Sequence, residues 1–436
     1  MSFYLVWPDT ERLTEEGFGN VADIPVVFDT NWSYQTLPSL YLRERALCNY
    51  RPRNAKMSVL ELTERSNQVF GESICNFLEW CELHSKDWRT LDYKNGILKG
   101  YQAALSAGTF SANQRGLAPS TANGRAQEAC NFLDWAYIRG FREEFRVITK
   151  TVPLTSSNPE LSHGHRQRFA EVRVGAVRPN PRSLHMPSKS DVSIWLESVG
   201  IEKGYTKCLM TELILRTAIR REEAVQWRTF TLPKPEEWII KGGEISVTIE
   251  YGAKGKKRKN ERGDIVGPAR TVMIPVDLAE RLHKYQETKR LKFFSIYVKS
   301  AKTSQERDAR RKNEPEQLFL SDYTGLPISA QTLYDAWTEA SRQPYKGWSP
   351  HLGRHYWACN ELLIEAKKHF DFLSKYDRSQ IPLDWIKGNV CDVITLRIQP
   401  QLGHIDKKTT ERYIAWAVQQ YRTGAIEDSY EQALEQ

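Results

Sequence analysis

The chain has 436 residues, of which 40% are hydrophobic and 27% are charged, and its formal net charge is +8. This composition is typical of a globular protein, and the length allows two or three domains that each have a core. No apolar run reaches the roughly 20 residues that a membrane-spanning helix needs. The N-terminus lacks the pattern of a signal peptide, and the seven cysteines form no C-x-x-C pair. We therefore expect a cytoplasmic protein with reduced thiols and no membrane partner.

The first 150 residues divide into a mixed segment and a helical segment. Residues 1–56 combine aromatic residues and prolines without a clear period and are slightly acidic. We interpret them as a structural extension of uncertain role. Residues 57–150 show the spacing of amphipathic helices, with one apolar face between Phe70 and Cys81 and another from Gly96 to Leu105. A third helix is expected from Pro119 to Gly140, and together these helices predict a small bundle.

Residues 151–187 contain five prolines among serine, asparagine and glycine, which predicts a linker. A larger domain follows at residues 188–436. Its apolar alternation predicts a strand near 245–251 and a return strand at 271–275, with a lysine-rich tip between them. Helices are expected near 188–199 and 204–217, around Arg220, from Asp277 and after about 328, with loops at 343–349 and 376–400. The predicted fold class is mainly α with a small antiparallel β-hairpin.

Basic charge gathers in three segments that we expect to be loops or hairpins. Residues 146–189 hold eight lysines and arginines against two acidic residues. The segment 251–270 holds seven against two, and 299–312 holds six against two. One such run is as often a solvated surface as a binding site, but three runs in one chain favour a nucleic-acid partner.

Five widely spaced polar residues form the most informative pattern of the chain. They are Arg220, His351, Arg354, His404 and Tyr413. Two arginines hold a phosphodiester through paired hydrogen bonds, imidazoles move protons, and a phenol attacks phosphorus. No cluster of carboxylates that would hold a metal accompanies them in the sequence. We therefore expect phosphoryl-transfer chemistry without a metal or another cofactor.

The order of arginine, hairpin lysine, His-x-x-Arg, Leu-Gly-His and tyrosine resembles the tyrosine recombinase (phage integrase) family. The segment from Pro119 to Ala136 is similar to that family's helical core-binding domain, and the resemblance covers about 57–425. It implies a helical, SAM-like DNA-binding domain at 57–150, a basic interdomain linker at 151–187, and an α+β catalytic domain with a C-terminal tail at 188–436.

The resemblance also implies a role for each matching residue. Arg220 and Arg354 match the catalytic arginines, and Tyr413 matches the nucleophile. Lys254 matches the hairpin lysine, which the family uses as general acid on the leaving 5′ oxygen. His351 and His404 match the two histidine positions. Glu223 stands three residues after Arg220 on one helix, so it is expected to orient that arginine.

The function that the resemblance implies is site-specific DNA recombination through a 3′-phosphotyrosyl intermediate, for integration, excision or transposition of a mobile element. The expected partner is double-stranded DNA with paired inverted repeats, bound by a homotetramer on synapsed DNA and by a monomer or dimer when free. Accessory proteins that bend DNA or set direction are possible partners, and the expected location is cytoplasmic and nucleoid-associated. Expected DNA-binding residues are Arg166, Arg168, Arg173, Lys256 and Lys257.

The sequence departs from the family pattern in three places and leaves alternatives open. Ala218 replaces a glycine, the hairpin loop offers Lys254 and three other lysines as general acid, and about 365–398 reads as an insertion. His355, next to the His-x-x-Arg motif, is interpreted as structural. A type IB topoisomerase-like enzyme and a non-catalytic DNA-binding relative are the alternative functions.

Overall fold

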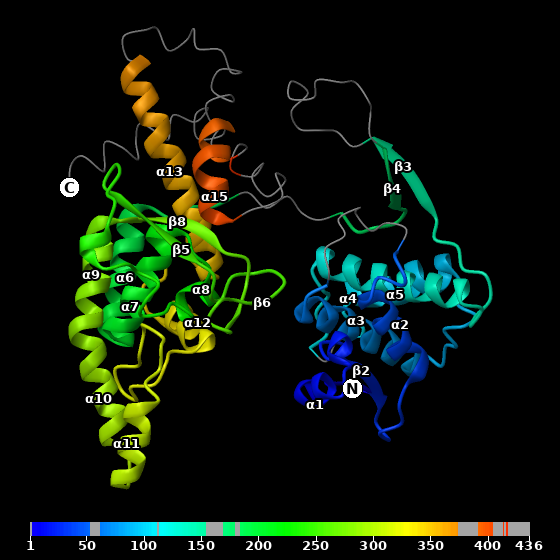
Figure 1. Cartoon of the computed structure of the whole chain (residues 1–436). Coiled ribbons are helices and arrows are strands. Elements are labelled where there is room, and N and C mark those ends of the chain that lie inside the picture. The colour runs from blue at the N-terminus through cyan, green and yellow to red at the C-terminus, as the bar shows by residue number, and fades with distance from the viewer. Residues whose placement is uncertain are drawn as a thin grey trace. The chain divides into compact units, whose positions relative to one another are not determined.

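The computed structural model describes residues 2–52, 62–110, 113–153, 169–178, 184–373, 391–403, 413 and 416. The chain divides into two compact units, Met1–Arg182 and Ser183–Gln436, here called the N-terminal unit and the C-terminal unit. Figure 1 shows their helices and small pairs of antiparallel strands. The predicted mainly α fold class is confirmed. In the part of the chain that the structure describes, no helix is both long and apolar enough to cross a membrane.

The N-terminal unit is a helical bundle with two short strand pairs. Its longest helices each carry the expected apolar face, and α3 is capped by Thr63, whose hydroxyl accepts from Ser66 N at 3.3 Å. Its elements are β1 (Phe3–Val6), α1 (Thr10–Glu15), η1 (Gly19–Val21), β2 (Val26–Asp29), α2 (Thr36–Ala46), α3 (Glu64–Leu83), η2 (Tyr93–Gln102), α4 (Ala103–Ala107), α5 (Pro119–Ile138), β3 (Thr149–Pro153) and β4 (Phe169–Arg173).

The N-terminal extension packs into the core of this bundle. Val27 from β2 and Tyr41 from α2 are fully buried in the same apolar cluster as Phe77 from α3. The Tyr41 phenol donates to Glu128 Oε1 on α5 at 2.7 Å, and Arg45 pairs with the same carboxylate. The first 52 residues therefore help to stabilise the unit.

Part of the predicted linker is folded. Strands β3 and β4 pair from Thr149↔Arg173 to Pro153↔Phe169, and the chain after β4 is held by three side chains of the bundle. The Tyr93 phenol donates to Val174 O at 2.6 Å, Gln102 donates to Gly175 O at 2.7 Å, and Asn123 exchanges two hydrogen bonds with Val177. Because these contacts are distant in sequence, local composition did not reveal them.

The C-terminal unit surrounds a core in which the rings of three buried tryptophans contact one another, one each from α6, α12 and the loop before α13. Its elements are α6 (Lys189–Lys203), α7 (Tyr205–Thr217), α8 (Arg221–Val225), η4 (Pro235–Glu237), β5 (Glu244–Ile249), β6 (Arg258–Lys259), β7 (Ile265–Val266), β8 (Arg270–Pro275), α9 (Val276–Tyr285), η5 (Gln286–Arg290), α10 (Leu291–Lys299), α11 (Ser304–Lys312), α12 (Ala330–Glu339), α13 (Pro350–Leu373), η7 (Ile394–Ile398) and α15 (Gln399–Leu402).

The predicted strand pair of this unit is confirmed. Strands β5 and β8 are antiparallel from Glu244↔Pro275 to Ile249↔Arg270, and the alternate residues of β5 are buried as the period of two requires. The short pair β6 and β7 lies in the chain between them. Strand β8 contacts both α7 and α15, so the small sheet joins parts of the chain that are far apart in sequence.

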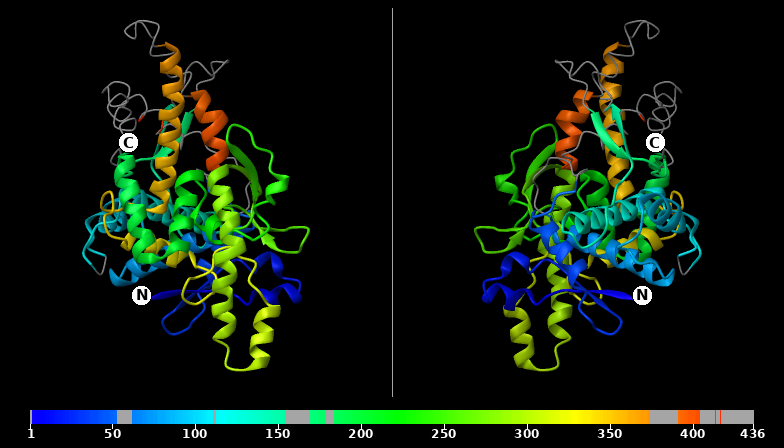
Figure 2. Two further views of the ribbon diagram at one scale, coloured as in Figure 1. Left: turned by 90° about the vertical axis from the view of Figure 1, so that its left-hand side faces the viewer. Right: turned by 90° about the vertical axis from the view of Figure 1, so that its right-hand side faces the viewer.

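Two predictions for this unit were wrong. The basic segment 299–312 contains the helix α11, because Thr303 caps it and Glu306 accepts from Lys302 N. Figures 1 and 2 show α10 and α11 as a helical hairpin. The predicted loop 376–400 includes helical residues from 391 onward, because Ile394, Ile398 and Leu402 bury one face in a third apolar cluster.

Candidate active site

The turn between α7 and α8 positions Arg220. Helix α7 ends at Ala218, which has the left-handed backbone angle φ of +53°, and the chain then extends through Arg220, the N-cap of α8. The Glu223 carboxylate accepts from Arg220 N at 2.6 Å and from Arg220 Nη1 at 2.9 Å. Both the backbone and the guanidinium of Arg220 are therefore held by one carboxylate.

Glu223 is the centre of a cluster of three arginines. It is fully buried and also accepts from Arg270 Nε at 3.1 Å and from Arg270 Nη2 at 2.6 Å. Arg354 Nη1 lies 3.9 Å from the same carboxylate. Burial alone would raise the pKa of Glu223, but hydrogen bonds and charge from Arg270 and Arg220 outweigh it and lower the pKa.

Backbone carbonyls at the end of α15 hold the same guanidiniums. Arg220 Nη2 donates to Leu402 O at 3.2 Å and to Gly403 O at 3.1 Å, and Arg354 Nη2 donates to Leu402 O at 2.7 Å. Gly403 has a φ of +60°, and an added Cβ would lie 2.8 Å from Arg270 Cδ. The glycine of the Leu-Gly-His motif therefore allows the chain to approach the arginines closely.

The arginine cluster carries more positive than negative charge. Three guanidiniums surround one carboxylate, and Arg354 is only 5% exposed. Burial, together with the nearby charge of Arg220, lowers the pKa of Arg354 to about 9. Within the described residues, Arg354 Nη1 is buried without a hydrogen-bond partner. Such a cluster favours the binding of an anion that accepts paired hydrogen bonds, as a phosphodiester does.

A tyrosine and two histidines lie next to this cluster. The Tyr413 side chain is fully buried and packs in one apolar cluster with Ala218 and Leu402. Its hydroxyl lies 2.6 Å from His355 Nδ1, and His355 Nε2 lies 3.1 Å from His351 Nε2. Both histidines and Arg354 belong to the first turns of α13, so one helix supplies a guanidinium and two imidazoles.

The chain resembles site-specific recombinases of known structure. The XerH site-specific recombinase bound to palindromic difH substrate is 15% identical, with 83% of this chain and 80% of that chain covered and a TM-score of 0.47. The Tn1549 transposon integrase in complex with circular intermediate DNA is 13% identical, with 87% and 95% covered and a TM-score of 0.43. A lambda integrase dimer bound to a COC′ core site is 12% identical, with 86% and 76% covered and a TM-score of 0.43.

No protein-family model and no curated protein matches the sequence.

The remaining predicted residues differ in their surroundings. Lys254 is exposed in the loop after β5. This loop begins close to α8, because a Cβ added to Gly252 would lie 2.3 Å from Glu222 O. Lys256 and Lys257 are exposed before β6. Arg173 is buried and donates to the Tyr93 phenol, which favours a packing role over DNA binding. Three predicted site residues lie outside the described part of the chain, namely His404, Arg166 and Arg168.

Sequence reasoning missed two residues of the site. Arg270 was counted only as part of a basic segment, although its guanidinium binds Glu223. His355 was interpreted as structural, although it contacts the Tyr413 hydroxyl. The spacing of His351 and His355 at i, i+4 was an available signal, since residues four apart meet on one helical face.

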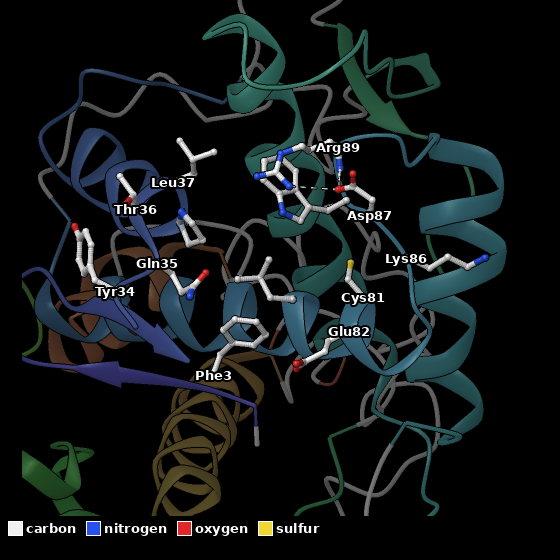
Figure 3. Close-up of a pocket in the computed structure, with 13 residues that line it drawn as sticks. Phe3, Tyr34, Gln35, Thr36, Leu37, Cys81, Glu82, Lys86, Asp87 and Arg89 are labelled. Carbon is white, nitrogen blue, oxygen red and sulfur yellow. Dashed lines mark hydrogen bonds and ion pairs between the residues drawn. The ribbon is translucent and has the colours of Figure 1, made fainter. Parts of the chain in front are cut away.

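The N-terminal unit contains a cavity of about 490 Å³ that has no part in this site. Figure 3 shows its lining, which comes from β1, the start of α2, the end of α3 and the loop after α3. Asp87 and Arg89 form an exposed ion pair at 3.5 Å, and Arg89 stacks on Trp88. These contacts are local, and none of the predicted site residues lines the cavity.

Proposed function

We propose that this chain is a DNA breaking and rejoining enzyme in which Tyr413 is the nucleophile. The observation that carries the proposal is a cluster of three guanidiniums around one buried carboxylate, beside a buried phenol that contacts an imidazole. A phosphodiester has one negative charge, and its transition state under attack has more. The cluster supplies the compensating positive charge in a buried place, where electrostatic stabilisation is strongest.

The reaction follows from these groups. The Tyr413 oxygen forms a bond to phosphorus, and the bond from phosphorus to the 5′ oxygen breaks. The phenolic proton passes to a base, and the leaving 5′ oxygen takes a proton, for which Lys254 is the proposed donor. The product is a 3′-phosphotyrosyl link and a free 5′-OH. A second 5′-OH reverses the step, which rejoins the strands without ATP.

The two arginines test the proposal directly. We expect Arg220→Lys and Arg354→Lys each to slow cleavage by about 3 kcal/mol, or more than a hundredfold, because lysine keeps the charge but loses the planar fork. The probe is a duplex with a site selected for binding from random-sequence DNA and a nick near the cut. Single-turnover formation of the covalent complex measures the effect. Arg221→Lys is the matched control, and rates within threefold of wild type for either variant would remove that arginine from the site.

Cleavage is expected to continue without divalent metal ions. The positive charge that stabilises the transition state comes from guanidiniums, so no metal ion is needed for this purpose. The measurement is covalent complex formation after treatment with EDTA, with DNA binding followed in parallel. Lost cleavage that magnesium restores, with DNA binding unchanged, would contradict the proposed mechanism.

We propose site-specific recombination for the biological reaction, with integration, excision or transposition of a mobile element as its outcome. The proposed partner is DNA with paired inverted repeats. Each chain supplies one nucleophile and exchange cuts four strands, so four protomers act on two sites. Strand exchange that requires two copies of one short site supports this proposal. Relaxation of any supercoiled plasmid without such a site would instead indicate a type IB topoisomerase-like enzyme.

The lysine-rich tip between β5 and β8 is proposed to contact DNA phosphates. Replacing Lys256 and Lys257 together by glutamine should reduce the slope of log affinity against log salt by up to about two units, because each phosphate contact releases counterions. Filter binding at several salt concentrations measures this slope. The control replaces the exposed lysines Lys234 and Lys241 by glutamine, and it should keep the slope. A slope that equals the wild-type value in the Lys256 and Lys257 variant would place the tip away from DNA.

A further inference from the structure

We propose that His355 accepts the phenolic proton of Tyr413 and that His351 receives it at the surface, so that one chain contains a relay of two imidazoles. This inference rests on the proposed function, in which Tyr413 is the nucleophile. It assigns a catalytic role to His355, which contacts the reacting oxygen, and makes His351 the exit of the proton rather than its first acceptor.

The distances define the order of the relay. The Tyr413 hydroxyl contacts His355 Nδ1 at 2.6 Å, and the other nitrogen of that ring contacts His351 Nε2 at 3.1 Å. The rings of the two histidines are 4.5 Å apart and nearly perpendicular. His355 therefore has one nitrogen toward the nucleophile and the other toward its neighbour one helical turn earlier on α13.

Burial explains why a relay is needed. Tyr413 is fully buried and His355 is 3% exposed, whereas His351 is exposed. Only about one phenol in a thousand is ionised at pH 7 when the pKa is near 10, so attack requires a base. In this arrangement bulk water reaches only the last group, and the proton leaves through the two imidazoles.

The proton balance is simple. In the neutral tautomer of this proposal, His355 Nδ1 accepts from the phenol and Nε2 carries a proton that it donates to His351. When Tyr413 attacks, its O–H bond breaks and a proton bonds to His355 Nδ1. The Nε2 proton of His355 then moves to His351, which releases one proton to water. His355 returns to a neutral ring, and the net change is one proton from the phenol to solvent.

Burial and position favour this release. His355 follows Arg354 on α13, and the Arg354 guanidinium belongs to the cluster around Glu223. An ion is less well solvated at buried His355 than at exposed His351. The positive charge is more stable on exposed His351. Farther along α13, Glu361 pairs with Arg397, which also pairs with Glu244.

The experiment isolates activation of the nucleophile. The probe is the selected duplex with sulfur in place of the scissile 5′ oxygen, because a thiolate leaves without needing a proton. Single-turnover formation of the covalent complex is measured from pH 6 to 9 for wild type, His355→Ala, His355→Ala with added imidazole, and His351→Gln. The control is His283→Ala on α9, which removes a histidine that pairs with Glu287 near the surface. Thermal melting and DNA binding verify that each variant is folded and binds.

At pH 7, His355→Ala should form the covalent complex about 10² to 10⁴-fold more slowly than wild type, because the variant lacks the base. The loss should shrink as the pH rises, because hydroxide then ionises the phenol, and imidazole should restore part of the rate. His351→Gln should have a smaller effect, since His355 still accepts the proton but releases it more slowly. The rate of the His283→Ala control should equal that of wild type.

Two results would overturn the relay and leave the proposed function standing. One is a rate within threefold of wild type for His355→Ala at every pH. The other is a loss in that variant that is equal at every pH and is not restored by imidazole, which indicates a packing role only. A wild-type protein that forms no covalent complex, or a Tyr413→Phe protein that does form one, would overturn the relay and the proposed function together.

Discussion

Tyr413→Phe is expected to bind DNA with wild-type affinity and to form no covalent complex. The substitution removes only the nucleophilic oxygen and keeps the ring that packs with Ala218 and Leu402 in the C-terminal unit. The nicked duplex described above traps the covalent complex because the short 5′ strand diffuses away after cleavage. Gel electrophoresis under denaturing conditions then separates linked from free protein.

The matched control for this variant is Tyr356→Phe, which changes a buried tyrosine of α13 whose hydroxyl has no role in the proposed reaction. It should form the covalent complex at the wild-type rate. A covalent complex with Tyr413→Phe would show that another residue attacks phosphorus. Mapping the linked peptide by mass spectrometry would identify that residue.

Glu223→Gln is expected to destabilise the C-terminal unit by about 3–5 kcal/mol at pH 7, because it removes one member of a buried ionic cluster. The carboxylate has no exposed surface and holds Arg220 and Arg270 directly. Without its charge, the partly buried guanidiniums of Arg220 and Arg270 lose their ion-pair partner and repel one another. Hydrogen–deuterium exchange in the peptides that contain α8 and α15 measures the local free energy of unfolding.

The pH dependence of this effect has a definite sign. The folded protein lowers the pKa of Glu223 below its ordinary value, so the carboxylate contributes stability above the unfolded pKa of about 4.3. That contribution is lost as the pH falls through the folded pKa. The difference between wild type and Glu223→Gln should therefore be largest at neutral pH and shrink in acid, where Glu223 is protonated and resembles glutamine.

Glu222→Gln is the neighbouring control. Glu222 is exposed and pairs with Arg221 at the surface, so its loss should change stability by less than about 0.5 kcal/mol. Equal destabilisation by the two variants would mean that helix α8, rather than the buried cluster, determines the effect.

Local patterns in the sequence predicted most of the elements. The α7 and α9 helices and the β5–β8 pair follow from apolar periods of 3.6 and 2, which neighbouring residues determine. The contact between Arg220 and Glu223 was also predictable, because it spans three residues of one helical turn. The position of Lys254 relative to the arginines was less predictable, because Lys254 lies in a long loop.

The sequence by itself determined the fold class, the two strands and the order of the polar residues that indicates phosphoryl transfer. Only the tertiary structure decided that Arg270 shares Glu223 and that His355 contacts the Tyr413 hydroxyl. These pairs are separated by 47 and 58 residues. A periodic sequence pattern does not predict such contacts, because they form only when helices and strands that are distant in sequence pack together in the core. The local pattern therefore supplied the chemical groups, and packing of the core supplied their geometry.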